Sequence, residues 1–148
     1  MAIPRGIRNN NPLNIRRGSE WQGLKKKQQD PEFCQFTSAS LGYRAAFRLL
    51  NTYYTKYGLT NLKAIIERFA PPVENNTLMY IVTVKHYFLQ YTGKMLNEVE
   101  TLPPVDHDQK TWCAIVRAMV AMECGAKWAD DVSTPGLISS GYKIAFNN

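Results

Sequence analysis

The segment DHDQKTWCAIVRAMVAMECG, residues 106–125, has a clear helical period. Apolar side chains recur in it at intervals of three and four residues and so fall on one stripe of a helix: Trp112, Ile115, Val116, Met119 and Val120. Asp106 is a suitable N-cap, and two aspartates in the first turn suit the positive end of the helix dipole. Gly125 is a suitable C-terminal stop. We therefore expect a long, largely buried helix between these two residues.

A glutamate continues the apolar stripe at the last turn of this helix. Glu123 follows Val120 by three residues and Met119 by four, which places it on the same face. Burial and the negative end of the helix dipole both disfavour a charged carboxylate there and should raise its pKa. A carboxylic acid that stays protonated near neutral pH suits the general acid of a glycosidase. The structural alternative is a glutamate that turns out to solvent or pairs with a nearby cation.

Three further helices are expected before this one, at about residues 38–57, 60–70 and 74–91. Ser38 or Ser40 can cap the first, and Gly58 can end it. Thr60 can cap the second, which must end before Pro71. Residues 92–105 read as a connector, and the chain beyond residue 125 as a loop followed by a short element.

The first 37 residues lack helical periodicity and carry many Gly, Pro and Asn residues. We expect an irregular segment with a short hairpin near Trp21 and near FCQF, residues 33–36, whose two phenylalanines pack inward. The resulting fold class is mostly α, with a single domain over residues 1–148 and a small irregular or β-hairpin N-terminal segment.

The N-terminal segment contains NNNPLNIR, residues 9–16, in which asparagines surround a proline. Asparagine forms helices poorly and is costly to bury without partners. One interpretation is a turn in which the amides cap local backbone. The other is a surface that holds a polar ligand, because amides both donate and accept hydrogen bonds.

Composition and charge restrict the class of partner. The chain of 148 residues is 45% hydrophobic and 20% charged, which is typical of a globular protein. It lacks an apolar run of about 18 residues, so no membrane insertion is expected. The net charge of +6 favours an anionic partner. Lys25–Lys27 can be a solvated loop or part of a nucleic-acid-binding module. Nucleic acid is not the expected partner, since neither a recognition helix nor a stacking platform is evident.

The cysteines and histidines form no metal or catalytic signature. Cys34, Cys113 and Cys124 lack a CxxC pair and are expected to be reduced thiols, with Cys113 in the core. No cofactor and no metal are therefore expected. His86 and His107 are far apart in the sequence.

Other carboxylates are candidates for a second catalytic group. Glu74 precedes a helix, where it can be a capping or first-turn acid, but its polar neighbours could also make it part of a site. Asp30 and Glu32 lie in a loop and could supply a second carboxylate, whereas Glu67 is interpreted as a solvated helix residue. The polar residues that follow Glu74 are candidates for substrate binding: Asn75, Asn76 and Tyr80.

An ordered set of motifs resembles a family of small bacteriophage and prophage proteins. The matching stretches are RGIRNNNPLNIR, GYRAAFRLL, the IIERFAPPVENNT segment and the late AIVRAMVAMECG. In that family they read roughly RGIRNNNPGNI, GIRA, RWAPPxENNT and AIxxHENG. Its members are described as virion structural proteins or as cell-wall lytic enzymes.

Two parts of the chain also resemble cell-wall glycosidases. Glu123-Cys124-Gly125 is similar to the Glu-Ser-Gly triplet that ends the catalytic helix of lysozyme-like lytic transglycosylases, with a cysteine in place of the usual serine or asparagine. NNNPLNIR followed by Trp21-x-Gly23 is similar to a segment of autolysin-type N-acetylglucosaminidases. In those enzymes this segment follows the catalytic glutamate, so the resemblance implies a circularly permuted lysozyme-like domain.

These resemblances imply a peptidoglycan glycan-strand cleaving enzyme with Glu123 as general acid. Glu74, from its polar neighbours, is the candidate for the second catalytic residue. Asn10, Asn11 and Asn14 would line the glycan cleft, and Trp21 would pack on a sugar face. The alternative is a non-catalytic virion or secretion-apparatus protein that binds cell-wall glycan or other proteins of that assembly. The bond cut, and hydrolysis versus transglycosylation, stay open.

The N-terminus lacks the apolar region of a signal peptide. We expect synthesis in the cytoplasm and action at the bacterial cell wall or periplasm after release or delivery, with packaging in a virion as one route.

Overall fold

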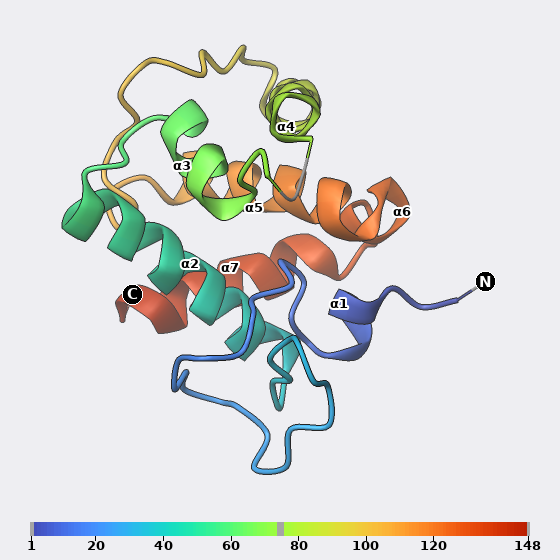
Figure 1. Ribbon diagram of the computed structural model, residues 1–148. Coiled ribbons are helices and arrows are strands. Elements are labelled where there is room, and N and C mark those ends of the chain that lie inside the picture. Colours follow the sequence, from blue (N-terminus) through green and yellow to red (C-terminus); the bar gives the residue numbers. More distant parts are fainter. Residues whose placement is uncertain (1, 74–75, 148) are drawn as a thin grey trace.

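The computed structural model describes residues 2–73 and 76–147 (Figure 1). The expectation of a mostly α fold is confirmed, because helices make up most of the described chain. They are α1 (Arg5–Arg8), α2 (Ala39–Tyr57), α3 (Leu62–Phe69), α4 (Thr77–Thr92), α5 (Gln109–Cys124), α6 (Ala126–Ala129) and α7 (Thr134–Phe146).

The ends of α2 match the sequence expectation. The Ser38 hydroxyl accepts a hydrogen bond from the Leu41 N–H, and Gly58 ends the helix in the left-handed conformation. The expected cap of α3 was wrong by one residue, since Asn61 rather than Thr60 accepts from the Ala64 N–H. The cap must lie directly ahead of the first helical residue for its side chain to reach that N–H.

The same rule corrects the start of α5. Asp108, not Asp106, is the N-cap, and its carboxylate accepts a hydrogen bond from the Thr111 N–H at 3.0 Å. Asp106 lies in the turn before the helix, so the first turn does not hold the two expected aspartates. The rest of the helix agrees with the sequence pattern, because the five stripe residues are fully buried and Gly125 follows Cys124 as the C-cap.

The short element expected near the C-terminus is in fact the 13-residue helix α7. The serines and glycines of STPGLISSG favoured a turn interpretation. However, Pro135 is compatible with the first turn of a helix. Ile138, Tyr142 and Ala145 lie one turn apart and are buried together, and this apolar spacing was the missed helical signal.

The N-terminal hairpin was predicted only approximately. Two isolated antiparallel bridges, Arg16 to Phe33 and Leu24 to Phe36, bring the expected segments together, but no strand forms within the described residues. The short helix α1 was not anticipated. Phe36 is fully buried as expected, whereas Phe33 is half-buried.

The core is arranged around α5, which packs against α4, α6 and α7. Figure 1 shows α5 between α4 and α7, with α2 beside α7 and the N-terminal segment curving below them. Phe47 of α2 meets Tyr142 of α7 edge to face, with ring centroids 5.1 Å apart. Within the described part of the chain, no helix combines the length and the apolar character needed to cross a bilayer.

Candidate functional site

The asparagine-rich stretch forms a tight turn that uses each asparagine differently. Asn10 and Asn14 both have a backbone φ of 53°, a left-handed conformation that asparagine tolerates better than most residues. Asn11 is fully buried and braces the turn, since its amide donates to the carbonyls of Ile15 and Cys34 and accepts from the Ile15 N–H. The interpretation of a turn whose amides bind local backbone therefore applies to Asn11.

The turn lies directly against α2. A Cβ atom at Gly42 would collide with the carbonyl oxygen of Asn10, so only glycine permits this approach. The Asn10 amide donates to the Phe36 carbonyl at 3.1 Å, which ties the turn to the loop that leads into α2.

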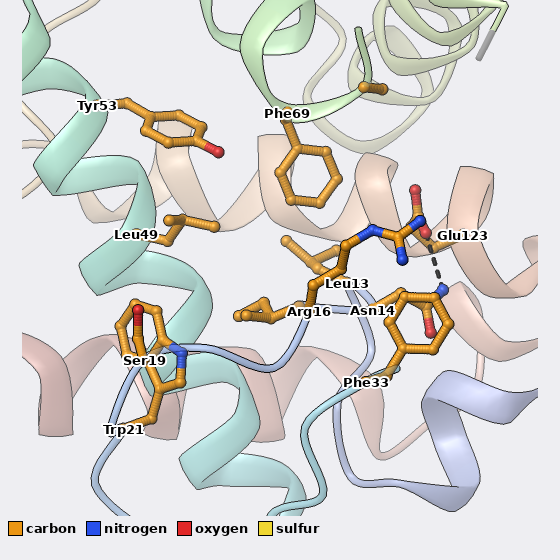
Figure 2. Close-up of a pocket in the computed structure, with 12 residues that line it drawn as sticks. Leu13, Asn14, Arg16, Ser19, Trp21, Phe33, Leu49, Tyr53, Phe69 and Glu123 are labelled. Carbon is orange, nitrogen blue, oxygen red and sulfur yellow. Dashed lines mark hydrogen bonds between the residues drawn. The ribbon is translucent and has the colours of Figure 1, made fainter. Parts of the chain in front are cut away.

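A pocket of about 350 Å³ opens between this turn, α2, the end of α3 and the end of α5 (Figure 2). Its size falls within the range of about 300–1,000 Å³ that is typical of small-molecule sites. The residues that line it are Leu13, Asn14, Ile15, Arg16, Ser19, Trp21, Phe33, Leu49, Tyr53, Phe69, Ala70 and Glu123.

Glu123 contributes a carboxyl group to this pocket, as its place on the α5 stripe suggested. The Asn14 amide donates a hydrogen bond to Glu123 Oε1 at 2.8 Å across a separation of 109 residues (Figure 2). Burial raises the pKa of Glu123, while the hydrogen bond from Asn14 opposes part of that rise. Among the described residues, the polar contacts of Glu123 are with Asn14 and Tyr80. The alternative in which Glu123 pairs with a cation therefore does not apply.

Tyr80 lies beneath the pocket rather than in its lining. Its hydroxyl is buried beside Glu123 and interacts with that carboxyl, but it lacks a well-formed hydrogen bond. Burial and the neighbouring Glu123 charge both raise the pKa of Tyr80 well above its ordinary value, so the phenol stays protonated. Tyr80 is thus placed to stabilise Glu123 as a neighbour, and it is not exposed to a ligand.

Cys124, the last residue of α5, also attaches the end of this helix to the asparagine turn. Its thiol donates a hydrogen bond to the Pro12 carbonyl at 3.3 Å, which joins the end of α5 to the asparagine turn. Burial raises the pKa of Cys124 to about 12, so the thiol is neutral and a poor nucleophile. Cys124 therefore acts as a buried hydrogen-bond donor.

Aromatic and cationic side chains form the remaining walls. Trp21 lines the pocket, as the sequence suggested, with Phe69 and Phe33 among the other aromatic residues (Figure 2). The guanidinium of Arg16 lies over the Phe33 ring, 5.2 Å from its centroid, and that of Arg5 lies 4.6 Å from the same centroid.

The loop carboxylates do not reach this pocket. Asp30 is buried and forms a bidentate ion pair with Arg5, at 2.6 and 2.7 Å, which holds the pKa of Asp30 well below its usual range. Glu32 is exposed and pairs with Arg5 and Arg16, and Glu67 pairs with Lys63. Of the described residues that line the pocket, Glu123 is the single carboxylate.

Other expected binding residues lie elsewhere. Asn10 and Asn11 do not line the pocket, because Asn10 lines a different hollow beside the start of α2 and Asn11 is buried. Asn76 caps α4 and faces a different hollow. Glu74 and Asn75 lie outside the described residues.

Several pocket residues were not singled out from the sequence as site residues. Leu49 and Tyr53 lie one turn apart on α2 and line the pocket from that helix. Arg16 ends the NNNPLNIR stretch and Phe69 lies in the IIERFAPPVENNT segment, but neither side chain was itself expected at the site, and the fold brings both to the pocket that holds Glu123. The part of the chain that the structure describes holds no group of three or more metal-binding side chains, and its three cysteines are free thiols.

No protein-family model matches the chain. The chain is similar to "Protein P5" of Pseudoalteromonas phage PM2, with 39% identity over 126 residues, which cover 82% of this chain and 72% of that protein. An identity of this level over most of both chains shows common descent. The chain therefore belongs to the family of Protein P5 of Pseudoalteromonas phage PM2.

Proposed function

We propose that this protein cleaves the glycan strands of peptidoglycan, with Glu123 as the general acid. The observation that carries the proposal is a carboxyl group with a raised pKa in a pocket between aromatic walls, fixed by an amide from a distant turn. A glycosidase needs such a protonated carboxyl group to supply a proton to its leaving group.

The chemistry follows from the position of this acid. Glu123 donates its proton to the glycosidic oxygen while the bond from that oxygen to the anomeric carbon breaks, and the sugar left behind acquires oxocarbenium character. Asn14 holds the carboxylate that forms, because its hydrogen bond stabilises the charged state.

The second step depends on which group attacks the anomeric carbon. No other described carboxylate lines the pocket, so we assign the attack to the substrate's own acetamide or 6-hydroxyl group. A 6-hydroxyl that attacks gives its proton back to Glu123 and leaves a 1,6-anhydro sugar. Of hydrolysis and transglycosylation, this assignment favours transglycosylation.

The permuted lysozyme-like arrangement belongs to the same proposal. The asparagine turn precedes Glu123 by about a hundred residues, yet its amide contacts the Glu123 carboxyl. In a permuted domain the asparagine turn comes before the Glu123 helix in the chain, instead of after it, and the two segments must still meet in the fold. The P5 relative comes from a bacteriophage, and a phage offers both lysis and virion packaging as delivery routes to the wall.

The test is turnover of isolated peptidoglycan by the wild type and by Glu123→Gln, with products identified by mass. We expect release of anhydro muropeptides, each one water lighter than its reducing counterpart, and a loss of at least about 100-fold in the variant. Glu67→Gln removes an exposed carboxylate of α3 and should keep full activity.

No release by the wild type from walls of several chemical types would overturn the proposal. Binding of intact sacculi without cleavage would instead favour the alternative of a glycan-binding virion or secretion protein. Reducing products that disappear in Glu123→Gln would keep the general acid but replace the transglycosylase step with hydrolysis.

A further inference from the structure

A second pocket lies away from Glu123 and shares no residue with the first. It has a volume of about 470 Å³ and is formed where the C-terminal half of α4, the N-terminal half of α5 and the start of α7 meet. The described residues that line it are Phe88, Tyr91, Thr92, Lys94, Lys110, Thr111, Cys113, Ala114, Arg117, Pro135 and Ile138.

The charged groups of this pocket are all cationic. Lys94, Lys110 and Arg117 line it, and no described carboxylate does. The two lysine side chains are exposed and form no ion pair with any described residue. Arg117 is held in place by the Ala129 carbonyl at 2.9 Å and lies 4.0 Å from the centroid of the Tyr91 ring.

The carboxylate that pairs with Arg117 is shared with Tyr91. Asp130 accepts from the Tyr91 hydroxyl at 3.2 Å and pairs with Arg117 at 3.5 Å. It therefore compensates part of the Arg117 charge and leaves the two lysines without a partner. The rim of the pocket has an excess of positive charge that an anionic ligand can neutralise.

The floor of the pocket is apolar. Phe88, Ala114 and Ile138 are buried core residues that form part of the lining. Cys113 is half-buried among them, and burial alone raises its pKa to about 12, without an opposing effect from the nearby cations. The cations thus lie at the rim and an apolar surface lies below them.

We propose that this second pocket binds an anionic amphiphile, a molecule with an acyl chain and a carboxylate or phosphate end. The acyl chain contacts the apolar floor, and the anionic end lies between Lys94 and Lys110. The same chemistry is available from a free fatty acid and from an anionic phospholipid. Binding here is independent of the reaction at Glu123, so the two proposals can fail separately.

The test uses sodium dodecanoate below its micelle concentration, with Cys113 as the reporter. Cys113 lines the pocket and is the least buried of the three cysteines. Its raised pKa makes the thiol react slowly, so iodoacetamide labelling is followed over a long time course at a fixed alkaline pH, with peptide mass mapping. Saturating dodecanoate should slow the labelling of Cys113 about tenfold and leave the rates at Cys34 and Cys124 unchanged. Dodecanol, which has the same chain without the charge, should protect at least about tenfold more weakly.

Two matched double variants separate the effect of the lysines at the pocket from the effect of the protein's net charge. Lys94→Gln with Lys110→Gln should weaken dodecanoate binding about tenfold. Lys26→Gln with Lys143→Gln removes the same charge from exposed positions outside both pockets and should leave binding unchanged.

A second arm distinguishes the two sources. Vesicles of phosphatidylcholine with phosphatidylglycerol, but not of phosphatidylcholine alone, should protect Cys113 if the pocket takes a membrane lipid; protection by dodecanoate only assigns a free acid. The proposal would be overturned if neither dodecanoate nor the vesicles changed the labelling of Cys113. It would also be overturned if the Lys94/Lys110 variant and the Lys26/Lys143 variant lost dodecanoate binding equally.

Discussion

At the scale of single residues, the pairing of Asn14 with Glu123 defines the candidate site. Asn14 has a left-handed backbone conformation, which asparagine tolerates, and its side-chain amide donates a hydrogen bond to the Glu123 carboxyl. Glu123 is half-buried at the end of a helix, where desolvation raises its pKa.

The raised pKa predicts a pH effect on stability that requires no knowledge of a substrate. Above pH 4.5, the ordinary pKa of a glutamate, the unfolded chain releases the Glu123 proton before the folded protein does. The unfolded state then binds fewer protons, so this group lowers the free energy of unfolding as the pH rises towards the raised pKa. Glu123→Gln should remove the effect.

Urea unfolding of the wild type and of Glu123→Gln at a series of pH values measures how the free energy of unfolding depends on pH. The difference in free energy of unfolding, Glu123→Gln minus wild type, should be larger at pH 7 than at pH 4. A difference that is constant with pH would mean that Glu123 is not desolvated in the folded protein.

Asn14→Ala tests the partner of Glu123. Loss of the amide removes the hydrogen bond that opposes the rise in the Glu123 pKa, so that pKa should rise further. We expect cleavage to fall about tenfold at its optimum. The alkaline limb of the pH–rate profile should also move to higher pH.

Asn14→Asp keeps the shape but places a carboxyl group against Glu123 and should reduce cleavage as well. Full activity with an unmoved profile in Asn14→Ala would show that Asn14 is not a positioning residue.

At the scale of elements, close packing of α2 on α7 holds the wall of the pocket. A Cβ atom at Gly141 of α7 would lie 2.5 Å from the Tyr43 Cβ of α2 and 2.9 Å from the Arg44 nitrogen. Such distances are below van der Waals contact, and the backbone nitrogen cannot move aside. The two helices can pack at this separation only if residue 141 is glycine.

Gly141→Ala should therefore lower the free energy of unfolding by about 2 kcal/mol through overpacking. Gly136→Ala, on the same helix, is the matched control because a Cβ atom there meets nothing within 4 Å. Alanine has the higher helix propensity, so this variant should be neutral or more stable by about 0.5 kcal/mol. Equal effects of the two changes on urea unfolding would contradict this account of the α2–α7 contact.

At the scale of the whole molecule, the net charge of +6 is unevenly placed. The loop that carries Trp21 also carries Lys25, Lys26 and Lys27, all exposed, and Arg16 lies at the pocket itself. An anionic polymer that approaches this face is attracted before it reaches Glu123.

Association with isolated cell walls should accordingly weaken with salt. Raising sodium chloride from about 50 to 300 mM should reduce the bound fraction several-fold, because exposed charges are screened. Replacement of Lys25, Lys26 and Lys27 by glutamine should flatten this salt dependence while the urea midpoint stays unchanged. Binding that does not vary with salt would show that the lysine loop contributes nothing to association.

Much of the helical fold could be predicted from local pattern. The stripe of α5, the cap at Ser38 and the stop at Gly58 each depend on residues close together in the chain, so spacing and propensity were sufficient. The helix α7 was missed because its Ser and Gly residues favour turns locally. Burial of its apolar stripe against α2 and α5 outweighs that preference.

By itself, the sequence determined that Glu123 lies on an apolar helix face, and it offered a turn as one of two interpretations of residues 9–16. Only the tertiary structure decided that Asn14, rather than Asn10 or Asn11, contacts Glu123, and that Asp30 is tied to Arg5 instead. The physical reason is separation along the chain. A contact across 109 residues leaves no periodic trace in the sequence, whereas each turn of a helix is specified by neighbours three and four residues apart.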